Sequence, residues 1–204
     1  MASLWLFGSL AISAIGVMAA PPAPDPVRVD PNIAVRDIHG SLQHPFLAPK
    51  GHAAVVFFVA TDCPVANGYA PEIRRICEAY KAKAGCTLAY VDPTLSTEAV
   101  SKHVIAYQHG DYPAVIDTKH LLVKASGATV TPEVVVVLSG GAIAYRGRID
   151  DKYFALGRSR QNPVERNLRD VMENFVAGKP ILTARTTPVG CFITPLEFFT
   201  HNKN

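Results

Sequence analysis

Residues 55–73 read VVFFVATDCPVANGYAPEI. The opening run of valine and phenylalanine predicts a buried strand. Cys63 and Pro64 follow at once, and proline suits the first position of a helix because its missing N–H would be unpaired there anyway. The segment therefore predicts a strand that leads into a helix with a thiol at the helix N-terminus. The unpaired N–H groups and the helix dipole favour the thiolate there, which is the nucleophilic form of cysteine.

Two further prolines bear on the role of this thiol. Pro71 lies inside the expected helix, where proline normally kinks the chain. Thr131 and Pro132 stand just before the apolar run of residues 134–138. Both features count against the alternative that Cys63 is only a structural residue at a strand–helix junction.

These motifs, in their order and spacing, resemble the thioredoxin superfamily, and within it the redoxins of the alkyl hydroperoxide reductase and thiol-specific antioxidant type. The resemblance extends over roughly residues 35–177. It implies an α/β, thioredoxin-like fold, in which a central mixed sheet is flanked by helices and carries an N-terminal hairpin and a C-terminal extension. It also implies that Pro132 follows a cis peptide bond and lies against Cys63.

The sequence departs from the two best-known patterns of that superfamily. Thioredoxins carry a second cysteine three residues after the first, and this chain has Ala66 there. Peroxiredoxins carry Thr or Ser three residues before the reactive cysteine, where this chain has Ala60, and Thr61 comes one residue too late. The departures argue against a local resolving cysteine and against the standard peroxide-reducing geometry.

The remaining secondary structure follows from apolar runs, turn residues and capping residues. Ser96 and Asn162 are expected to cap the second and fourth helices. The predicted strands are 33–38, 42–46, 53–60, 87–92, 114–117, 134–138 and 142–146, and the predicted helices are 64–84, 97–108, 121–126 and 163–177.

Composition excludes several classes of function. The 204 residues are 49% hydrophobic and 18% charged, which is typical of one globular domain with a full core. A net charge of +3 is too small to indicate a nucleic-acid partner. The sequence has no glycine-rich phosphate loop, and we expect no cofactor.

The N-terminus has the pattern of an export signal. Residues 4–20 are apolar or small and uncharged, and a proline-rich stretch follows them. We expect a cleaved signal peptide at 1–19, a Pro-rich linker at 20–32, the redoxin-like domain at 33–178 and a tail at 179–204. The protein would then be periplasmic or secreted, with no stable membrane span after cleavage. An uncleaved anchor is the alternative, although about 17 residues is marginal for crossing a bilayer.

Export would permit disulfides among Cys63, Cys77, Cys86 and Cys191, and four cysteines allow three full pairings. The helix is expected to end near residue 84, which places Cys77 about two turns, or ~10 Å along the axis, before that end. This is too far for easy bridging to Cys86 at the start of the next strand. We therefore expect Cys77 and Cys86 to be unpaired and buried as small hydrophobic residues.

Cys191 lies in the tail, beyond the last helix. The 13 residues from Gly178 to Cys191 can extend ~43 Å, so the tail is long enough to return to Cys63. Cys191 is therefore the best available resolving partner. A passive disulfide, or a free thiol under the tail, is the alternative.

The sequence favours a thiol–disulfide oxidoreductase or thiol-dependent antioxidant with Cys63 as nucleophile and Cys191 as resolving cysteine. Its partners would be protein thiols and disulfides or small peroxides, together with an external thiol reductant. Arg148 is a candidate for favouring the thiolate, and a local ion pair at a strand end is the alternative. The expected substrate-binding residues are Thr61, Asp62, Pro64, Asn67, Thr131, Pro132 and Arg148.

Two rival functions remain open. The first is a non-catalytic binding module in which a Cys63–Cys191 disulfide only staples the fold, since a fold does not determine a function. The second is a copper-handling chaperone, but such proteins carry a second cysteine four residues after the first, where this chain has Asn67. The seven histidines show no ligand pattern, so we expect no metal site.

Overall fold

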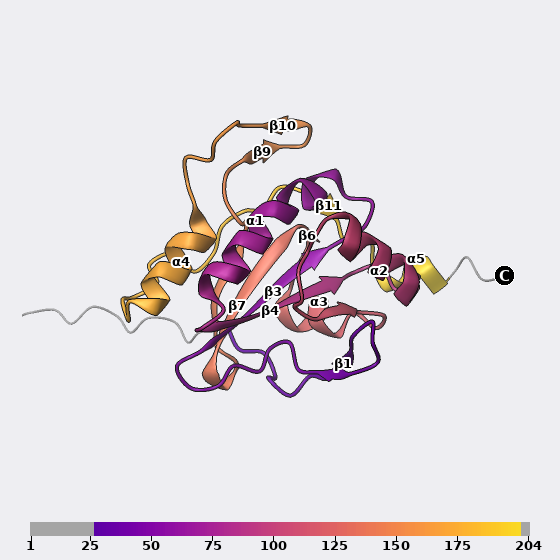
Figure 1. Cartoon of the computed structure of the whole chain (residues 1–204), viewed down its shortest axis with the longest axis horizontal. Helices are drawn as coiled ribbons and strands as arrows, with labels where there is room; N and C mark the ends of the chain where they lie inside the picture. The colour runs from indigo at the N-terminus through magenta and orange to yellow at the C-terminus, as the bar shows by residue number, and fades with distance from the viewer. Residues whose placement is uncertain (1–26, 201–204) are drawn as a thin grey trace, which may run out of the picture.

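The fold is built on a mixed sheet of five strands, in the order β5-β4-β3-β7-β8 (Figure 1). The structure is a computed structural model and describes residues 27–200. β3, β4 and β5 are parallel, whereas β7 runs antiparallel to β3 and β8 runs antiparallel to β7. The strands are β3 (Ala53–Val59), β4 (Ala84–Tyr90), β5 (Ala114–Ile116), β7 (Glu133–Leu138) and β8 (Ile143–Gly147). This arrangement confirms the predicted α/β, thioredoxin-like fold.

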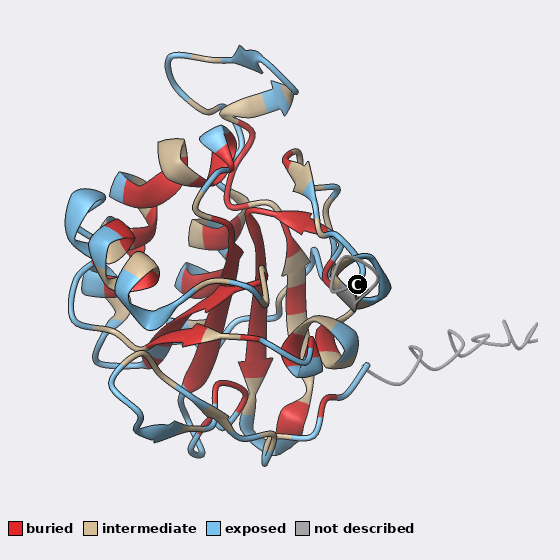
Figure 2. Cartoon of the chain, turned by 90° about the vertical axis from the view of Figure 1, so that its right-hand side faces the viewer, coloured by how far each residue is buried: buried red, intermediate tan, exposed pale blue. Residues whose placement is uncertain are grey.

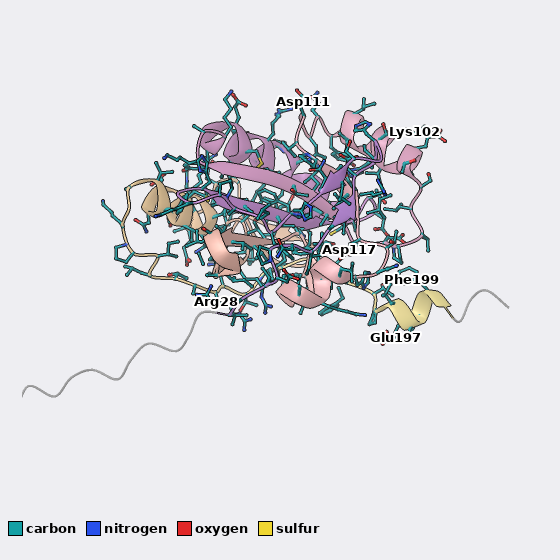
Figure 3. The ribbon with its side chains drawn as sticks, turned by 90° about the horizontal axis from the view of Figure 1, so that it is seen from below. Arg28, Lys102, Asp111, Asp117, Glu197 and Phe199 are labelled. Atoms are coloured by element: carbon teal, nitrogen blue, oxygen red, sulfur yellow. A yellow bond between two sulfur atoms is a disulfide. The ribbon has the colours of Figure 1, made fainter. Side chains whose placement is uncertain are left out.

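Helices cover both faces of the sheet, and α1 and α3 lie on opposite sides of it (Figure 3). All seven residues of β3 are buried, and the central strands form the core (Figure 2). Such continuous burial explains why this strand reads as an unbroken apolar run rather than an alternating one. The helices are α1 (Pro64–Tyr80), α2 (Thr97–Ala106), α3 (Leu121–Ser126), α4 (Asn167–Val176) and α5 (Leu196–Thr200).

Short two-stranded pairs lie outside the five-stranded sheet. The expected N-terminal hairpin is present but small, with β1 (Val35–Arg36) paired to β2 (Leu42–Gln43). A second hairpin, β9 (Tyr153–Ala155) with β10 (Arg158–Ser159), projects from the body of the molecule and was not predicted (Figure 1). A 3₁₀ turn at Ser139–Gly141 links β7 to β8.

Two predicted helix boundaries were wrong by four residues. α1 ends at Tyr80 rather than near residue 84, because Ala84 already pairs with Ala53 in the sheet. α4 begins at Asn167, and its N-cap is Arg166 rather than Asn162. The residues just before α4 are held outside the helix because the backbone N–H groups of residues 164 and 165 donate to the Asp151 carboxylate.

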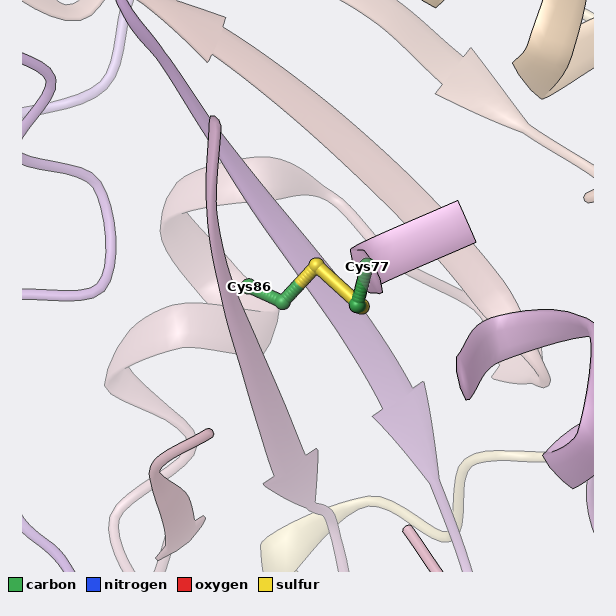
Figure 4. The surroundings of a disulfide bond; sticks show 2 residues. All are labelled: Cys77 and Cys86. Carbon is green, nitrogen blue, oxygen red and sulfur yellow. A yellow bond between two sulfur atoms is a disulfide. The ribbon is translucent and has the colours of Figure 1, made fainter. Parts of the chain in front are cut away.

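The expectation that Cys77 and Cys86 are unpaired is also wrong. They form a disulfide with a Cα–Cα distance of 5.9 Å (Figure 4). The earlier end of α1 places Cys77 in its last turn, and β4 then runs back along the helix, which brings Cys86 level with it. The prediction failed because it extended the helix into the first residues of the strand.

The end of the expected linker belongs to the folded domain. The backbone N–H of Val29 donates to Gly141, and the N–H of Ile143 donates to Val27. Residues 27–29 therefore extend the sheet at β8, whereas the expected signal peptide at 1–19 lies outside the described residues. Across residues 27–200, none of the helices has the length and apolar character needed to cross a membrane.

Candidate active site at the start of α1

The thiol of Cys63 caps α1 from its N-terminal end. Its backbone is extended, and its sulfur accepts a hydrogen bond from the N–H of Ala66 at 3.5 Å. In the protonated form the same sulfur donates to the carbonyl of Thr131 at 3.0 Å. Cys63 is 0% exposed to solvent, so these protein groups take the place of water around it. The predicted strand–thiol–helix geometry is therefore present.

Thr131 is the residue on which the site converges. It ends β6 (Val130–Thr131), and the bond between Thr131 and Pro132 is cis, as the family resemblance implied. Both residues are buried, and β7 starts directly after them. The carbonyl that accepts the Cys63 thiol is therefore placed by the turn that leads into the central sheet.

The C-terminal tail returns to the same residue. β11 (Cys191–Phe192) pairs antiparallel with β6, and this register sets Cys191 opposite Thr131. The Thr131 hydroxyl donates to the carbonyl of Cys191 at 3.5 Å. Gly190 packs so closely on the Thr131 carbonyl that no Cβ would fit, which explains a glycine at this position. The structure thus brings Cys63 and Cys191 together, and both are free thiols.

The two thiols differ in acidity. Burial raises the pKa of Cys63, but hydrogen bonds from the side chains of Cys191 and Thr131 and from the Ala66 N–H outweigh it, so the pKa of Cys63 lies below its usual value. Burial, the hydrogen bond to Cys63 and the negative charges of Cys63 and Asp62 all raise the pKa of Cys191. Cys63 is therefore the more acidic thiol of the pair, and Cys191 is the hydrogen-bond donor that stabilises its anion.

A chain of hydrogen bonds holds the loop that leads to Cys63. The side-chain amide of Asn67 donates to the carbonyl of Thr61 at 2.9 Å. Its oxygen accepts from Nε2 of His103 at 2.9 Å, which assigns the ring proton to Nε2 because an amide oxygen only accepts. Burial lowers the pKa of His103, so the ring is neutral and Nδ1 accepts from the hydroxyl of Tyr90 at 2.9 Å. The sequence pointed to Asn67, but no local signal joins it to His103 or Tyr90.

Tyr153 is a second residue that the sequence did not indicate. It stands at the base of the β9–β10 hairpin, and its ring lies 5.1 Å from that of Tyr69 on α1. Burial and the negative charges of Asp150 and Cys63 raise the pKa of Tyr153, which places it within electrostatic reach of the thiol. Gly68 leaves room for the tyrosine hydroxyl, because a Cβ at that position would collide with it.

The other expected site residues divide into two groups. Asp62 and Pro64 are exposed at the helix start beside the thiol pair. The guanidinium of Arg148 is held by Asn167 at 2.7 Å and Glu165 at 2.7 Å, which is the local ion pair given as its alternative role. Within residues 27–200, no cluster of three or more His, Cys, Asp or Glu side chains is arranged to hold a metal ion.

Comparison with known proteins gives a family and a fold. A family model described as Redoxin matches residues 30–154. A hypothetical protein of Sinorhizobium meliloti 1021 has a TM-score of 0.69 and 21% identity over 84% of this chain and 94% of its own. An uncharacterized conserved protein of Geobacillus kaustophilus has a TM-score of 0.69 and 20% identity over 89% of this chain and 98% of its own.

A third solved structure is the thioredoxin domain of a thiol-disulfide oxidoreductase from Bacteroides vulgatus. It has a TM-score of 0.54 and 16% identity over 76% of this chain and 99% of its own. No curated protein shows significant similarity to the chain. At these identities the solved structures establish a shared fold.

Proposed function

The chain belongs to the redoxin family, and from this premise we propose that it is a thiol–disulfide oxidoreductase with Cys63 as nucleophile and Cys191 as resolving cysteine. The family and the thioredoxin-like fold support a redox function. The observation that carries the proposal is the pair of free thiols at Thr131, whose pKa values are shifted in opposite directions. One thiolate beside one protonated thiol is the arrangement that stepwise exchange requires.

The exchange proceeds in two steps. The Cys63 thiolate attacks one sulfur of a substrate disulfide, a mixed disulfide forms, and the other substrate sulfur leaves as a thiolate. Cys191 then gives up its proton to that thiolate and attacks the Cys63 sulfur. The second substrate sulfur leaves Cys63 as a thiolate and takes a proton from water. The products are a Cys63–Cys191 disulfide and a substrate with two free thiols, so two electrons pass from the protein to the substrate.

The reduction of small peroxides is a second candidate function. The observation that favours it is the Thr131 side chain, which helps to lower the pKa of Cys63 and brings a hydroxyl to a site where Ala60 supplies none. In this reaction Cys63 would take one peroxide oxygen as a sulfenic acid and release an alcohol or water. Cys191 would then condense with the sulfenic acid to form the disulfide and one molecule of water.

Export is part of the proposal. Residues 4–20 have the apolar pattern of a signal peptide, and the Cys77–Cys86 disulfide suits an oxidising compartment. N-terminal sequencing of the protein recovered from a cell envelope or medium fraction should start at Ala20. A full-length chain retained in the cytosol would contradict this.

Trapping a reaction intermediate tests the exchange proposal. A Cys191→Ser variant should accumulate a mixed disulfide with a disulfide-bearing protein substrate, because the second step is blocked. Mass mapping should locate the adduct at Cys63, and a Cys63→Ser variant is the matched control. Adducts that form equally in both variants would overturn the assignment of the nucleophile.

The reduction potential of the Cys63–Cys191 couple separates exchange from a structural staple. An active couple should lie above about −300 mV, and a staple below that value. Hydrogen peroxide in place of the protein disulfide tests the second candidate, for which sulfenic acid at Cys63 of the Cys191→Ser variant is the expected product.

A further inference from the structure

A polar cavity of about 450 Å³ lies between α1, the base of the β9–β10 hairpin and the start of α4. Its volume is within the range of roughly 300–1,000 Å³ that is usual for small-molecule sites. Gly68 and Tyr69 form its α1 wall, and Lys152 and Arg166 stand on the opposite side. None of the residues proposed above for the thiol chemistry lines this cavity.

The cavity carries an excess of positive charge. Four cationic side chains line it, against the carboxylates of Glu72 and Asp150. Glu72 is already shared by Arg75 at 2.8 Å and Arg169 at 2.6 Å. Asp150 accepts from the Tyr69 hydroxyl at 2.6 Å and from the backbone N–H of residue 152 at 2.8 Å.

Two of the four cations are therefore left for a ligand. Within residues 27–200, neither Lys152 nor Arg166 contacts a carboxylate, and Lys152 lies 5.5 Å from the centroid of the Tyr153 ring. The two side chains come from different segments and face one cavity. A ligand with carboxylate groups is the chemistry that such a pair complements.

Tyr153 connects the cavity to the thiol pair. Its ring packs on Tyr69 in the cavity wall, its hydroxyl lies against Gly68, and its pKa responds to the charge on Cys63. An anionic group held by Lys152 would therefore lie just behind a residue that neighbours the reactive sulfur.

We propose that this cavity binds the carboxylates of a small carboxylate-bearing thiol, which reduces the Cys63–Cys191 disulfide and so completes the catalytic cycle. This inference rests on the proposed function, because that cycle leaves the pair oxidised and in need of two electrons. The two cations without a carboxylate partner in residues 27–200, in a cavity that Tyr153 separates from the thiol pair, are the observation that carries it.

Two ligand thiols supply the two electrons that reduce the Cys63–Cys191 disulfide. The ligand thiolate attacks the Cys191 sulfur, which is the more accessible of the two, and Cys63 leaves because its thiolate is the better stabilised. A second ligand thiolate then attacks the sulfur of the first ligand molecule in the mixed disulfide with Cys191. Cys191 leaves and is protonated, and two thiols have become one small-molecule disulfide.

A comparison of two thiols tests the inference. The rate of reduction of the oxidised protein is measured with glutathione, which carries two carboxylates, and with 2-mercaptoethanol, which carries none. We expect Arg166→Gln and Lys152→Gln each to lower the ratio of the two rates at least about fivefold. Lys102→Gln, which changes an exposed lysine on α2, should leave the ratio as in the wild type (Figure 3).

A binding measurement supplies an independent readout. S-methylglutathione cannot react, and it should bind a Cys63→Ser/Cys191→Ser variant by calorimetry, more weakly by at least about fivefold once Arg166→Gln is added. A rate ratio that Arg166→Gln and Lys152→Gln leave unchanged would overturn the cavity assignment while the exchange function stands. Failure of both thiols to reduce the protein would overturn the exchange function together with it.

Discussion

The two ends of α1 each hold two cysteines, and the two pairs are in different chemical states. At the C-terminal end, Cys77 and Cys86 are joined in a disulfide between the helix and the following strand. At the N-terminal end, Cys63 and Cys191 are free, although β11 brings the tail strand directly onto Thr131. One pair is local in sequence, and the other is assembled by the return of a distant tail.

The difference teaches how the fold separates stability from reactivity. The Cys77–Cys86 disulfide closes a short helix–turn–strand loop and limits the freedom of the unfolded chain there. The Cys63 thiol is instead surrounded by donors that stabilise its anion, and its partner is kept protonated. We therefore expect changes at one end of α1 to act on stability and changes at the other to act on exchange.

The largest expected effect is on activity. Cys63→Ser should lower the rate of protein disulfide reduction by about 1,000-fold or more, because the nucleophile is lost. The double variant Cys77→Ala/Cys86→Ala should change that rate less than about threefold, with the reduction of insulin disulfides as the assay for both variants. Equal losses at both ends would abolish the distinction between the two pairs.

The next effect is on stability, and here the larger change is expected at the C-terminal end of α1. Removal of the Cys77–Cys86 cross-link, in the same double variant, should lower the free energy of unfolding by about 2.6 kcal/mol, as the closure of a loop of this length predicts. Cys191→Ala, at a half-buried thiol without a cross-link, should cost less than about 1 kcal/mol. Urea denaturation under non-reducing conditions measures both, and a larger loss for Cys191→Ala would reverse the comparison.

Acid should weaken the protein through buried histidines rather than through the disulfide. Burial, together with the charges of His103 and Arg74, lowers the pKa of His109 from 6.5 to about 4. The unfolded chain therefore binds more protons in this window, so stability is complete above pH 6.5 and is lost as the pH falls toward 4.

Between pH 7 and pH 5 we expect His109 to account for a loss of about 1.8 kcal/mol in the free energy of unfolding. His109→Gln should flatten this part of the pH dependence, whereas the variant without the disulfide should retain it. Urea midpoints at the two pH values give the measurement. A wild-type pH dependence in His109→Gln would show that the acid effect arises elsewhere.

The smallest effect concerns the hydrogen-bond chain behind Cys63. His103→Ala removes the donor to Asn67 and should slow alkylation of Cys63 about threefold at pH 7, the scale of one hydrogen bond. The pH midpoint of alkylation should rise at the same time, and His103→Gln, which retains a donor, should restore part of the rate. A lower melting temperature with an unchanged midpoint would mean that the chain serves only the fold.

The sequence predicted what depends on short-range chemistry. An apolar run before Cys63 and Pro64 identifies the strand, the thiol and the helix start, and the Thr131–Pro132 motif identifies the loop that meets them. Chain length alone showed that Cys191 was able to return. These inferences hold because local propensity and tertiary contacts agree at the start of α1.

The misses share a physical cause, which is competition from contacts distant in sequence. β4 begins at residue 84 because this residue pairs with Ala53 in the sheet. The pairing ends α1 earlier and brings Cys86 to Cys77. The Asp151 carboxylate, far from α4 in sequence, holds the residues before that helix. His103 reaches Asn67 only after α2 has packed against α1, so no local sequence pattern predicts this hydrogen bond.

The exposed path of the tail toward β11 allows limited proteolysis to report whether Cys63 and Cys191 are joined. Leu182 is 88% exposed, in a segment that connects α4 to β11 without regular structure. A single cut there would release the peptide carrying Cys191 when the protein is reduced and denatured. After oxidation the same peptide would stay attached through Cys63, so a non-reducing gel of the clipped protein would report the fraction of molecules in which Cys63 and Cys191 are joined.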